Sequence, residues 1–221
     1  MLEATGTQEA VLVAFSCGVS WALQTAVDRP AQVRGIFAIA PSCGFTVPRP
    51  GRDMHAFDAR VESPQGWARY NRHHWLEGGY ADFVEFFLGR MFSEPHSTKQ
   101  VEDATGWAHD VGAATLADAT AGRLGCDGVA LPDLEQLCAR VRCPVGVLHG
   151  TGDRVTPAAV GERLAELTGA AMELVPDAGH GLPMRRPVLV NLAVSAFVHS
   201  LDPAVRQPAA RRAGSRRRGP A

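Results

Sequence analysis

The sequence predicts an α/β fold built around a parallel β-sheet. Short apolar segments rich in strand-forming residues alternate with helical segments near both ends of the chain. The first strand–helix–strand unit spans about thirty residues, which is the length of a crossover that joins two parallel strands. The chain has 221 residues, of which 46% are hydrophobic, and this suffices for one well-packed core.

The first unit of this pattern lies close to the N-terminus. Residues 11–15 and 36–40 are apolar, too short for helices and rich in strand formers, so we expect a strand at each. Residues 19–27 between them predict a helix that ends before Pro30. The two strands should therefore be parallel neighbours joined by a helical crossover.

The same alternation returns in the last third of the chain. Apolar residues 145–148 and 172–175 predict two further strands. Residues 158–167 and 187–200 predict the helices that follow them. No internal repeat is evident, so we expect a single sheet rather than a repeat array.

The middle of the chain lacks strand-like segments and predicts a helical insertion between two strands, over residues 45–138. Its helical stretches are residues 66–76, 80–92 and 97–110. The insertion is also rich in aromatic side chains, which could simply join its helices. Alternatively they line an apolar substrate pocket. The pocket candidates are Trp67, Tyr70, Trp75, Phe83 and Phe87.

Four regions follow from this pattern. Residues 1–44 and 139–201 are the two parts of the α/β core, residues 45–138 the insertion, and residues 202–221 a tail. Six arginines in the last sixteen residues make the tail basic, and its composition predicts disorder. Without these six charges the net charge falls from −1 to −7, so the body of the protein is mildly acidic. We expect no nucleic-acid partner.

The cysteines and the N-terminus indicate a cytoplasmic protein. The five cysteines are an odd number and no pair has the spacing of a zinc or redox motif, so we expect reduced thiols and no metal. Residues 1–10 lack the basic start and apolar run of a signal peptide. No apolar segment approaches the ~20 residues of a membrane-spanning helix, so we expect no membrane partner.

Ser16 comes directly after the first predicted strand and before the first predicted helix. Ala14 and Gly18 place small residues two positions before and after it. This pattern is typical of a nucleophile elbow, a strained turn that exposes a serine hydroxyl and in which larger neighbours would collide. The backbone N–H of Cys17 would face the oxyanion hole. Ser20 fits the same pattern but lies a helical turn beyond the strand, so we favour Ser16.

Two further polar residues follow predicted strands in the last third of the chain. Asp153 follows the strand at 145–148, and His180 lies in the loop before the last helix. The carboxyl ends of parallel strands meet at one edge of a sheet, so Ser16, Asp153 and His180 can come together there. His180 would take the serine proton and Asp153 would orient the imidazole. The alternatives are His149 as the base, Asp177 as the acid, or an aspartate that only caps a helix.

At these residues the sequence resembles the α/β-hydrolase superfamily. The strings HGTGD at residues 149–153 and AGHG at residues 178–181 are among that superfamily's more specific marks. Segments 11–42 and 143–198 look like the two parts of its core, and the insertion looks like its helical cap between the sixth and seventh strands. The resemblance covers about 200 of the 221 residues.

The resemblance implies a serine hydrolase with helices on both faces of a mostly parallel sheet. It implies Ser16, Asp153 and His180 as a catalytic triad and no metal or organic cofactor. The implied reaction is hydrolysis of an ester or other acyl bond in a small, apolar substrate, and acyl transfer stays open. A dehalogenase would need a carboxylate in place of Ser16. Segments 67–75 and 94–100 resemble one bacterial subgroup of the superfamily.

The N-terminus departs from the pattern of the superfamily. Other members carry further strands before the nucleophile strand, together with a loop that supplies a second oxyanion-hole N–H. We therefore expect the strand at residues 11–15 to form an exposed edge, through which the chain could self-associate or pair with another chain. The alternative function is a weak or inactive remnant, or half of a site that another chain completes.

Overall fold

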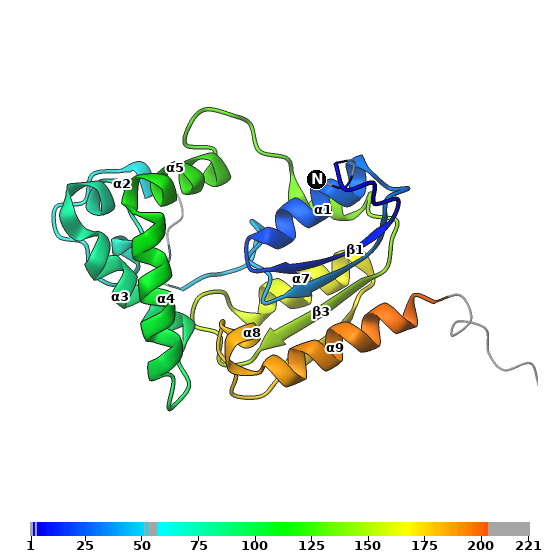
Figure 1. The fold of residues 1–221 in the computed structure, drawn as a ribbon. Helices are drawn as coiled ribbons and strands as arrows, with labels where there is room; N and C mark the ends of the chain where they lie inside the picture. Colours follow the sequence, from blue (N-terminus) through cyan, green and yellow to red (C-terminus); the bar gives the residue numbers. More distant parts are fainter. Residues whose placement is uncertain (1, 3, 51, 53–56, 203–221) are drawn as a thin grey trace, which may run out of the picture.

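The core is a sheet of four parallel strands. The computed structural model describes residues 2, 4–50, 52 and 57–202. The strands β1 (Ala10–Phe15), β2 (Val33–Ile39), β3 (Val145–Gly150) and β4 (Ala171–Val175) pair in the order β1-β2-β3-β4. Figure 1 shows β1 at one edge of this sheet. Apart from residue 202, the predicted tail lies outside the described residues.

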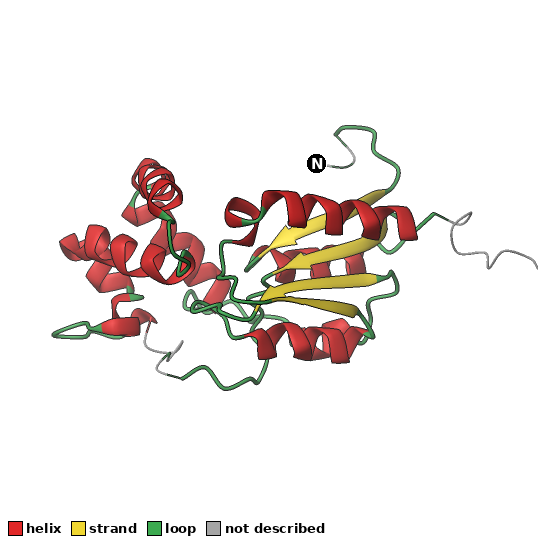
Figure 2. Ribbon diagram, turned by 90° about the horizontal axis from the view of Figure 1, so that it is seen from below, coloured by secondary structure: helices red, strands yellow, loops and turns green. Residues whose placement is uncertain are grey.

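Helices cover both faces of the sheet, as Figure 2 shows. One face packs against α1 (Gly18–Asp28), α6 (Leu134–Cys138) and α7 (Ala158–Thr168), and the other against α8 (Leu182–Arg185) and α9 (Pro187–Ser200). The strand β2 accounts for this division, because successive side chains of a strand point to opposite faces. Ile36 packs with the α1 and α7 side, whereas Phe37 packs with the α9 side.

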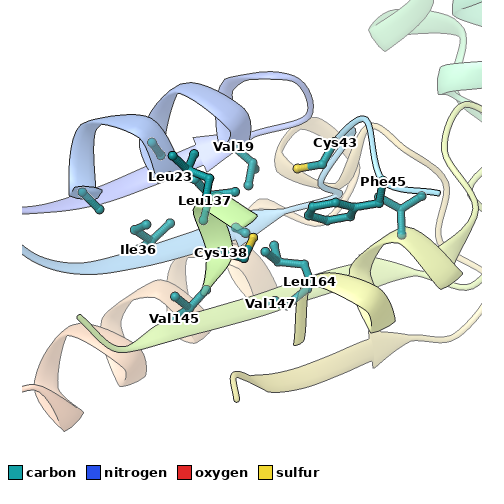
Figure 3. Packing of buried hydrophobic residues seen from close by; sticks show 14 of the residues in the cluster. Val19, Leu23, Ile36, Cys43, Phe45, Leu137, Cys138, Val145, Val147 and Leu164 are labelled. Carbon is teal, nitrogen blue, oxygen red and sulfur yellow. The ribbon is translucent and has the colours of Figure 1, made fainter. Parts of the chain in front are cut away.

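The larger of the two clusters around the sheet is drawn in Figure 3. It joins Leu23 of α1 and Leu164 of α7 to the strands. Phe45, Leu137 and Cys138 also belong to this cluster. All three fall within residues 45–138, so the two ends of the predicted insertion pack with the sheet and only its middle forms a separate body.

The predicted strands lie where β1 to β4 are found, and the bounds differ most at β2. This strand begins at Val33, three residues before the expected start. Arg34 and Gly35 interrupt its apolar pattern, although both are needed there. Arg34 donates a hydrogen bond to the Leu201 carbonyl at 3.2 Å. A Cβ at Gly35 would lie 2.8 Å from Leu201 and 3.2 Å from Phe197, so glycine lets the end of α9 approach the strand.

A separate group of helices lies between β2 and β3 in the sequence and beside the sheet in Figure 1. It contains α3 (Tyr80–Met91), α4 (Thr98–Val111) and α5 (Ala113–Leu124), which share an apolar cluster with Phe57 and Trp75. No helix in the described part of the chain is long and apolar enough to cross a membrane.

The helix expected over residues 66–76 is broken into short pieces. These are η2 (Gly66–Arg69), α2 (Arg72–His74) and η3 (Trp75–Gly79). Asn71 has an extended backbone and its side chain accepts a hydrogen bond from the His74 N–H at 3.1 Å. This capping side chain starts a new helical turn, so the apolar periodicity of the segment does not correspond to one continuous helix.

Candidate active site

The first element of the site is the turn between β1 and α1, which holds Ser16. Its φ of 54° lies in the left-handed region, which is rare for residues other than glycine. Two hydrogen bonds fix this conformation: the Ser16 N–H donates to the Ile39 carbonyl at 2.9 Å, and the Ser42 N–H donates to the Ser16 carbonyl at 3.1 Å. The loop after β2 therefore holds the elbow predicted at Ser16.

The steric reason expected for Gly18 is wrong in this structure. A Cβ at Gly18 would meet no atom within 4 Å. The start of α1 faces open space on that side, so no neighbouring element would collide with a larger side chain. The strain of the turn lies at Ser16 itself.

Three predicted residues from three different loops are joined by hydrogen bonds. His180 lies between β4 and α8, and its Nε2 lies 2.9 Å from Oγ of Ser16. Its Nδ1 lies 2.7 Å from Oδ2 of Asp153, in the loop after β3. An ionised carboxylate can only accept, so Nδ1–H donates to Asp153 and Nε2 is left to accept the serine proton. This arrangement can activate the hydroxyl as a nucleophile.

The carboxylate of Asp153 is fully buried and has four hydrogen-bond donors. Oδ1 accepts from the N–H groups of Val155 and Thr156, each at 2.8 Å. Oδ2 accepts from His180 and, at 3.1 Å, from Nε2 of His149. Burial alone would raise the pKa of Asp153. The hydrogen bonds from His149, His180 and the Thr156 N–H, together with the charge of His180, outweigh burial and hold the pKa well below its usual value. Asp153 therefore stays ionised at neutral pH.

The alternative site residues occupy other positions. His149 is buried beneath Asp153 and shares its Nε2 between that carboxylate and the Thr156 carbonyl. His149 therefore supports the Asp153 carboxylate through a hydrogen bond, whereas His180 is the histidine that contacts Ser16. Ser20 lies within α1, and Asp177 is an exposed turn residue whose N–H donates to Oγ1 of Thr151 at 2.9 Å.

Glu94 is a buried residue of the site that sequence reasoning missed. Its Oε1 accepts a hydrogen bond from the Gly179 N–H at 2.9 Å, next to His180. The Met91 carbonyl accepts from the Gly181 N–H at 3.0 Å on the other side of His180. The segment after α3 thus holds the histidine loop on both sides. A carboxylate directly after an apolar helix end was the available signal, but its partner is 85 residues away.

The five aromatic residues predicted as a pocket contact one another. Trp75 and Phe83 are 2% and 3% exposed, and their ring centroids lie 4.3 Å apart within the helical insertion. The ring of Phe87 contacts those of Trp67, Tyr70 and Phe83. An open cavity of about 750 Å³ lies elsewhere, against β4, α8 and α9, and none of the five aromatic residues lines it.

The N–H of Cys17 is the expected oxyanion donor. Cys17 is the N-cap of α1, so its N–H lies at the positive end of that helix. Cys43 is buried close by, and burial raises the pKa of its thiol to about 12, which keeps it neutral. In the described part of the chain, no group of three or more His, Cys, Asp or Glu side chains could hold a metal ion.

Comparison with known proteins identifies the family and the fold of the chain. The family model described as "Alpha/beta hydrolase family" matches residues 2–194. A thermophilic esterase from Thermogutta terrifontis, solved with malate bound, is 21% identical with a TM-score of 0.67; the match covers 90% of this chain and 68% of that one. A hydrolase from Pseudomonas aeruginosa PA01 is 21% identical with a TM-score of 0.71, over 89% of this chain and 67% of that one.

A third similar structure is an esterase from Rhodococcus sp. ECU1013, which is 18% identical with a TM-score of 0.67 over 91% of this chain and 69% of that one. A search of curated proteins finds no match. These identities establish a shared fold alone, whereas the family model extends over most of the sequence. The chain therefore belongs to the alpha/beta hydrolase family.

Proposed function

We propose that this protein is a serine hydrolase that cleaves an ester or other acyl bond of a small substrate, with Ser16 as nucleophile, His180 as base and Asp153 as orienting acid. The proposal rests on one observation: hydrogen bonds of 2.9 and 2.7 Å connect Ser16 to His180 and His180 to Asp153. Family membership supports it, although the fold alone does not determine the reaction.

Each residue has a defined step in this mechanism. Nε2 of His180 removes the proton from Oγ of Ser16 while Oγ attacks the acyl carbon. The N–H of Cys17 donates to the oxyanion that forms. His180 then returns the proton to the leaving oxygen, and the acyl group stays on Ser16. A water molecule, deprotonated by His180, releases the acid. Asp153 stays ionised throughout and stabilises the imidazolium.

The names of similar structures favour an ester or lactone. Several are esterases, and one is an N-acyl homoserine lactone degrading enzyme. The insertion favours a substrate with an apolar part, because it places aromatic rings beside the loop after β2. Trp67 and Tyr70 contact this loop through Arg52, whose guanidinium stacks on both rings.

A fluorophosphonate probe tests the proposal before any substrate is known. We expect the purified chain to gain the mass of one probe, and Ser16→Ala to gain none. Ser20→Ala is the matched control, since Ser20 shares the local sequence pattern but lies within α1. Labelling that persists in Ser16→Ala would refute the nucleophile. Absence of labelling in the folded parent chain would favour an inactive remnant, or a site that another chain completes.

A further inference from the structure

Three arginines gather between the loop after β2 and the helical insertion. The guanidinium of Arg52 stacks on Trp67 and Tyr70, with its Cζ 4.5 and 5.1 Å from the two ring centroids. Arg123 of α5 donates to the hydroxyl of the same Tyr70 at 2.7 Å. Arg49 lies three residues before Arg52 in the loop. One tyrosine ring therefore brings cations from the loop and from the insertion together.

These charges act on one another. The pKa of Arg52 is lowered to about 10, mainly by burial. The charges of Arg49 and Arg123 also lower it, while Tyr70 and the more distant Asp153 act in the opposite direction. Burial lowers the pKa of Arg49 as well, and Arg123 adds to that effect. Like charges held together in a partly buried place are unfavourable unless an anion joins them.

No protein carboxylate forms an ion pair with these three arginines within the described residues. Arg60, Arg69, Arg72 and Arg163 all form ion pairs with Asp or Glu. Arg49, Arg52 and Arg123 form none among the residues that the structure describes, and the Nε of Arg52 is buried without a hydrogen-bond partner. The cluster is positively charged, whereas the body of the chain carries a net negative charge.

Two hydrogen-bond paths, each through backbone groups, connect the arginine cluster to the hydrogen-bonded triad. Arg52 donates to the Val155 carbonyl at 2.8 Å, and the Val155 N–H donates to Asp153. Arg49 donates to the Cys43 carbonyl, and the preceding residue, Ser42, donates to Ser16. Within the described residues, each of the three guanidinium groups makes one hydrogen bond, and a guanidinium has five donors.

We infer that Arg49, Arg52 and Arg123 form a subsite for a carboxylate carried by the substrate, so that the preferred substrate is an ester with a free carboxylate at its other end. Guanidinium groups suit this ligand because their paired donors match the two oxygens of a carboxylate. An apolar chain between the two ends would lie against Trp67 and Tyr70. The inference rests on the proposed hydrolase function and narrows its substrate class.

The test compares two esters that differ only in charge: the para-nitrophenyl monoester of glutaric acid and the same ester with its free carboxyl methylated. We expect kcat/KM to favour the anionic ester by about tenfold or more in the parent chain. Arg52→Gln and Arg123→Gln should each remove most of this preference. Arg60→Gln is the matched control, because Arg60 is an exposed arginine of the insertion paired with Glu77. Arg52→Lys keeps the charge without the paired donors and should be intermediate.

A binding measurement separates this inference from the hydrolase proposal. Calorimetry should detect binding of glutarate to the Ser16→Ala chain. Adding Arg52→Gln should weaken this affinity about tenfold, and the neutral glutaramide should not bind. If neither ester is cleaved but glutarate binds in this way, the subsite stands and the hydrolase proposal fails. If both esters are cleaved equally by parent and variants, or if glutarate does not bind, the carboxylate subsite is refuted. Thermal melts of each variant identify any loss of folding.

Discussion

The carboxylate of Glu94 accepts the N–H of Gly179 at 2.9 Å, and this hydrogen bond ties the helical insertion to the loop of His180. Its other oxygen, Oε2, is buried without a partner. A Cβ at Gly179 would lie 2.8 Å from that oxygen, so the backbone and the carboxylate are in direct contact. Glu94 is thus a positioning residue for the histidine.

Removing the Glu94 side chain should loosen the histidine loop. We expect Glu94→Ala to lower kcat by ~10- to 100-fold with little change in KM, because a small displacement of His180 disrupts proton transfer. Glu94→Gln keeps an acceptor oxygen and should restore most of the activity. Glu102→Ala, at an exposed position of α4, is the control. Equal losses in the Ala and Gln variants would contradict a role based on this hydrogen bond.

The low pKa of Asp153 predicts a pH dependence of stability. Its folded-state pKa lies below the usual 3.8, so the unfolded chain binds this proton more tightly. The carboxylate therefore stabilises the fold fully above the unfolded-state pKa, and that stabilisation is lost as the pH falls toward the folded-state pKa. Asp153→Asn should lower the free energy of unfolding by about 2 kcal/mol at neutral pH, and by less near pH 3.

Guanidinium unfolding of parent and variant at both pH values checks this expectation. The exposed Asp110→Asn is the control and should have little effect at either pH. A difference between parent and Asp153→Asn that stays constant down to about pH 3 would argue against a depressed pKa at Asp153.

Two helical glycines should respond in opposite ways to alanine. A Cβ at Gly161 in α7 would lie 2.7 Å from Nδ1 of His149 and 3.0 Å from Met172. His149 is held by Asp153 and cannot easily move away, so Gly161→Ala should lower the free energy of unfolding. Gly106→Ala in α4 meets no atom within 4 Å and should raise it by up to ~1 kcal/mol. The midpoints of denaturant unfolding of the two variants test this expectation. An increase in stability in both variants would disprove the close approach of position 161 to His149.

The edge strand β1 should promote self-association. Among the strands of the described residues it pairs with β2 alone, and Val13 in its middle is 50% exposed. We expect light scattering to detect species larger than the monomer, and Val13→Lys to reduce them, because lysine on an edge strand opposes pairing. Val188→Lys removes a similarly exposed valine from α9 and should have no effect. A monomeric parent chain would rule out this mode of association.

The strand ends and the three residues that follow them could be predicted because their signals are local. The elbow at Ser16, the loop aspartate and the loop histidine each occupy a recognisable short pattern, and parallel strands bring such loops to one edge. The position of each of the three residues along the chain could be read from its own short pattern, whereas the contacts that hold its side chain in place come from other segments. That is why Ser16, Asp153 and His180 were found without knowing how the rest of the chain packs.

The supporting residues could not be predicted because their partners are remote in the sequence. Arg52 and Val155 are 103 residues apart, and Glu94 and Gly179 are 85 apart. In the sequence an arginine between predicted elements, or a glutamate after a helix, is an ordinary surface residue. The break within residues 66–76 was missed for a related reason, because apolar periodicity does not reveal that Asn71 caps a new turn.

The close approach of Phe197 to the sheet restricts the order in which substitutions can accumulate at the positions around it. Added Cβ atoms at Gly35 and Gly146, on neighbouring strands, would lie 3.2 and 3.0 Å from its ring. One aromatic side chain thus fills the space of two missing ones. Larger residues at either glycine need a smaller side chain at position 197, and also movement of Leu201 at the first glycine and of Phe37 at the second. The earlier change at position 197 opens a void beneath both strands. A mutational path between the two packings must therefore pass through a less stable intermediate.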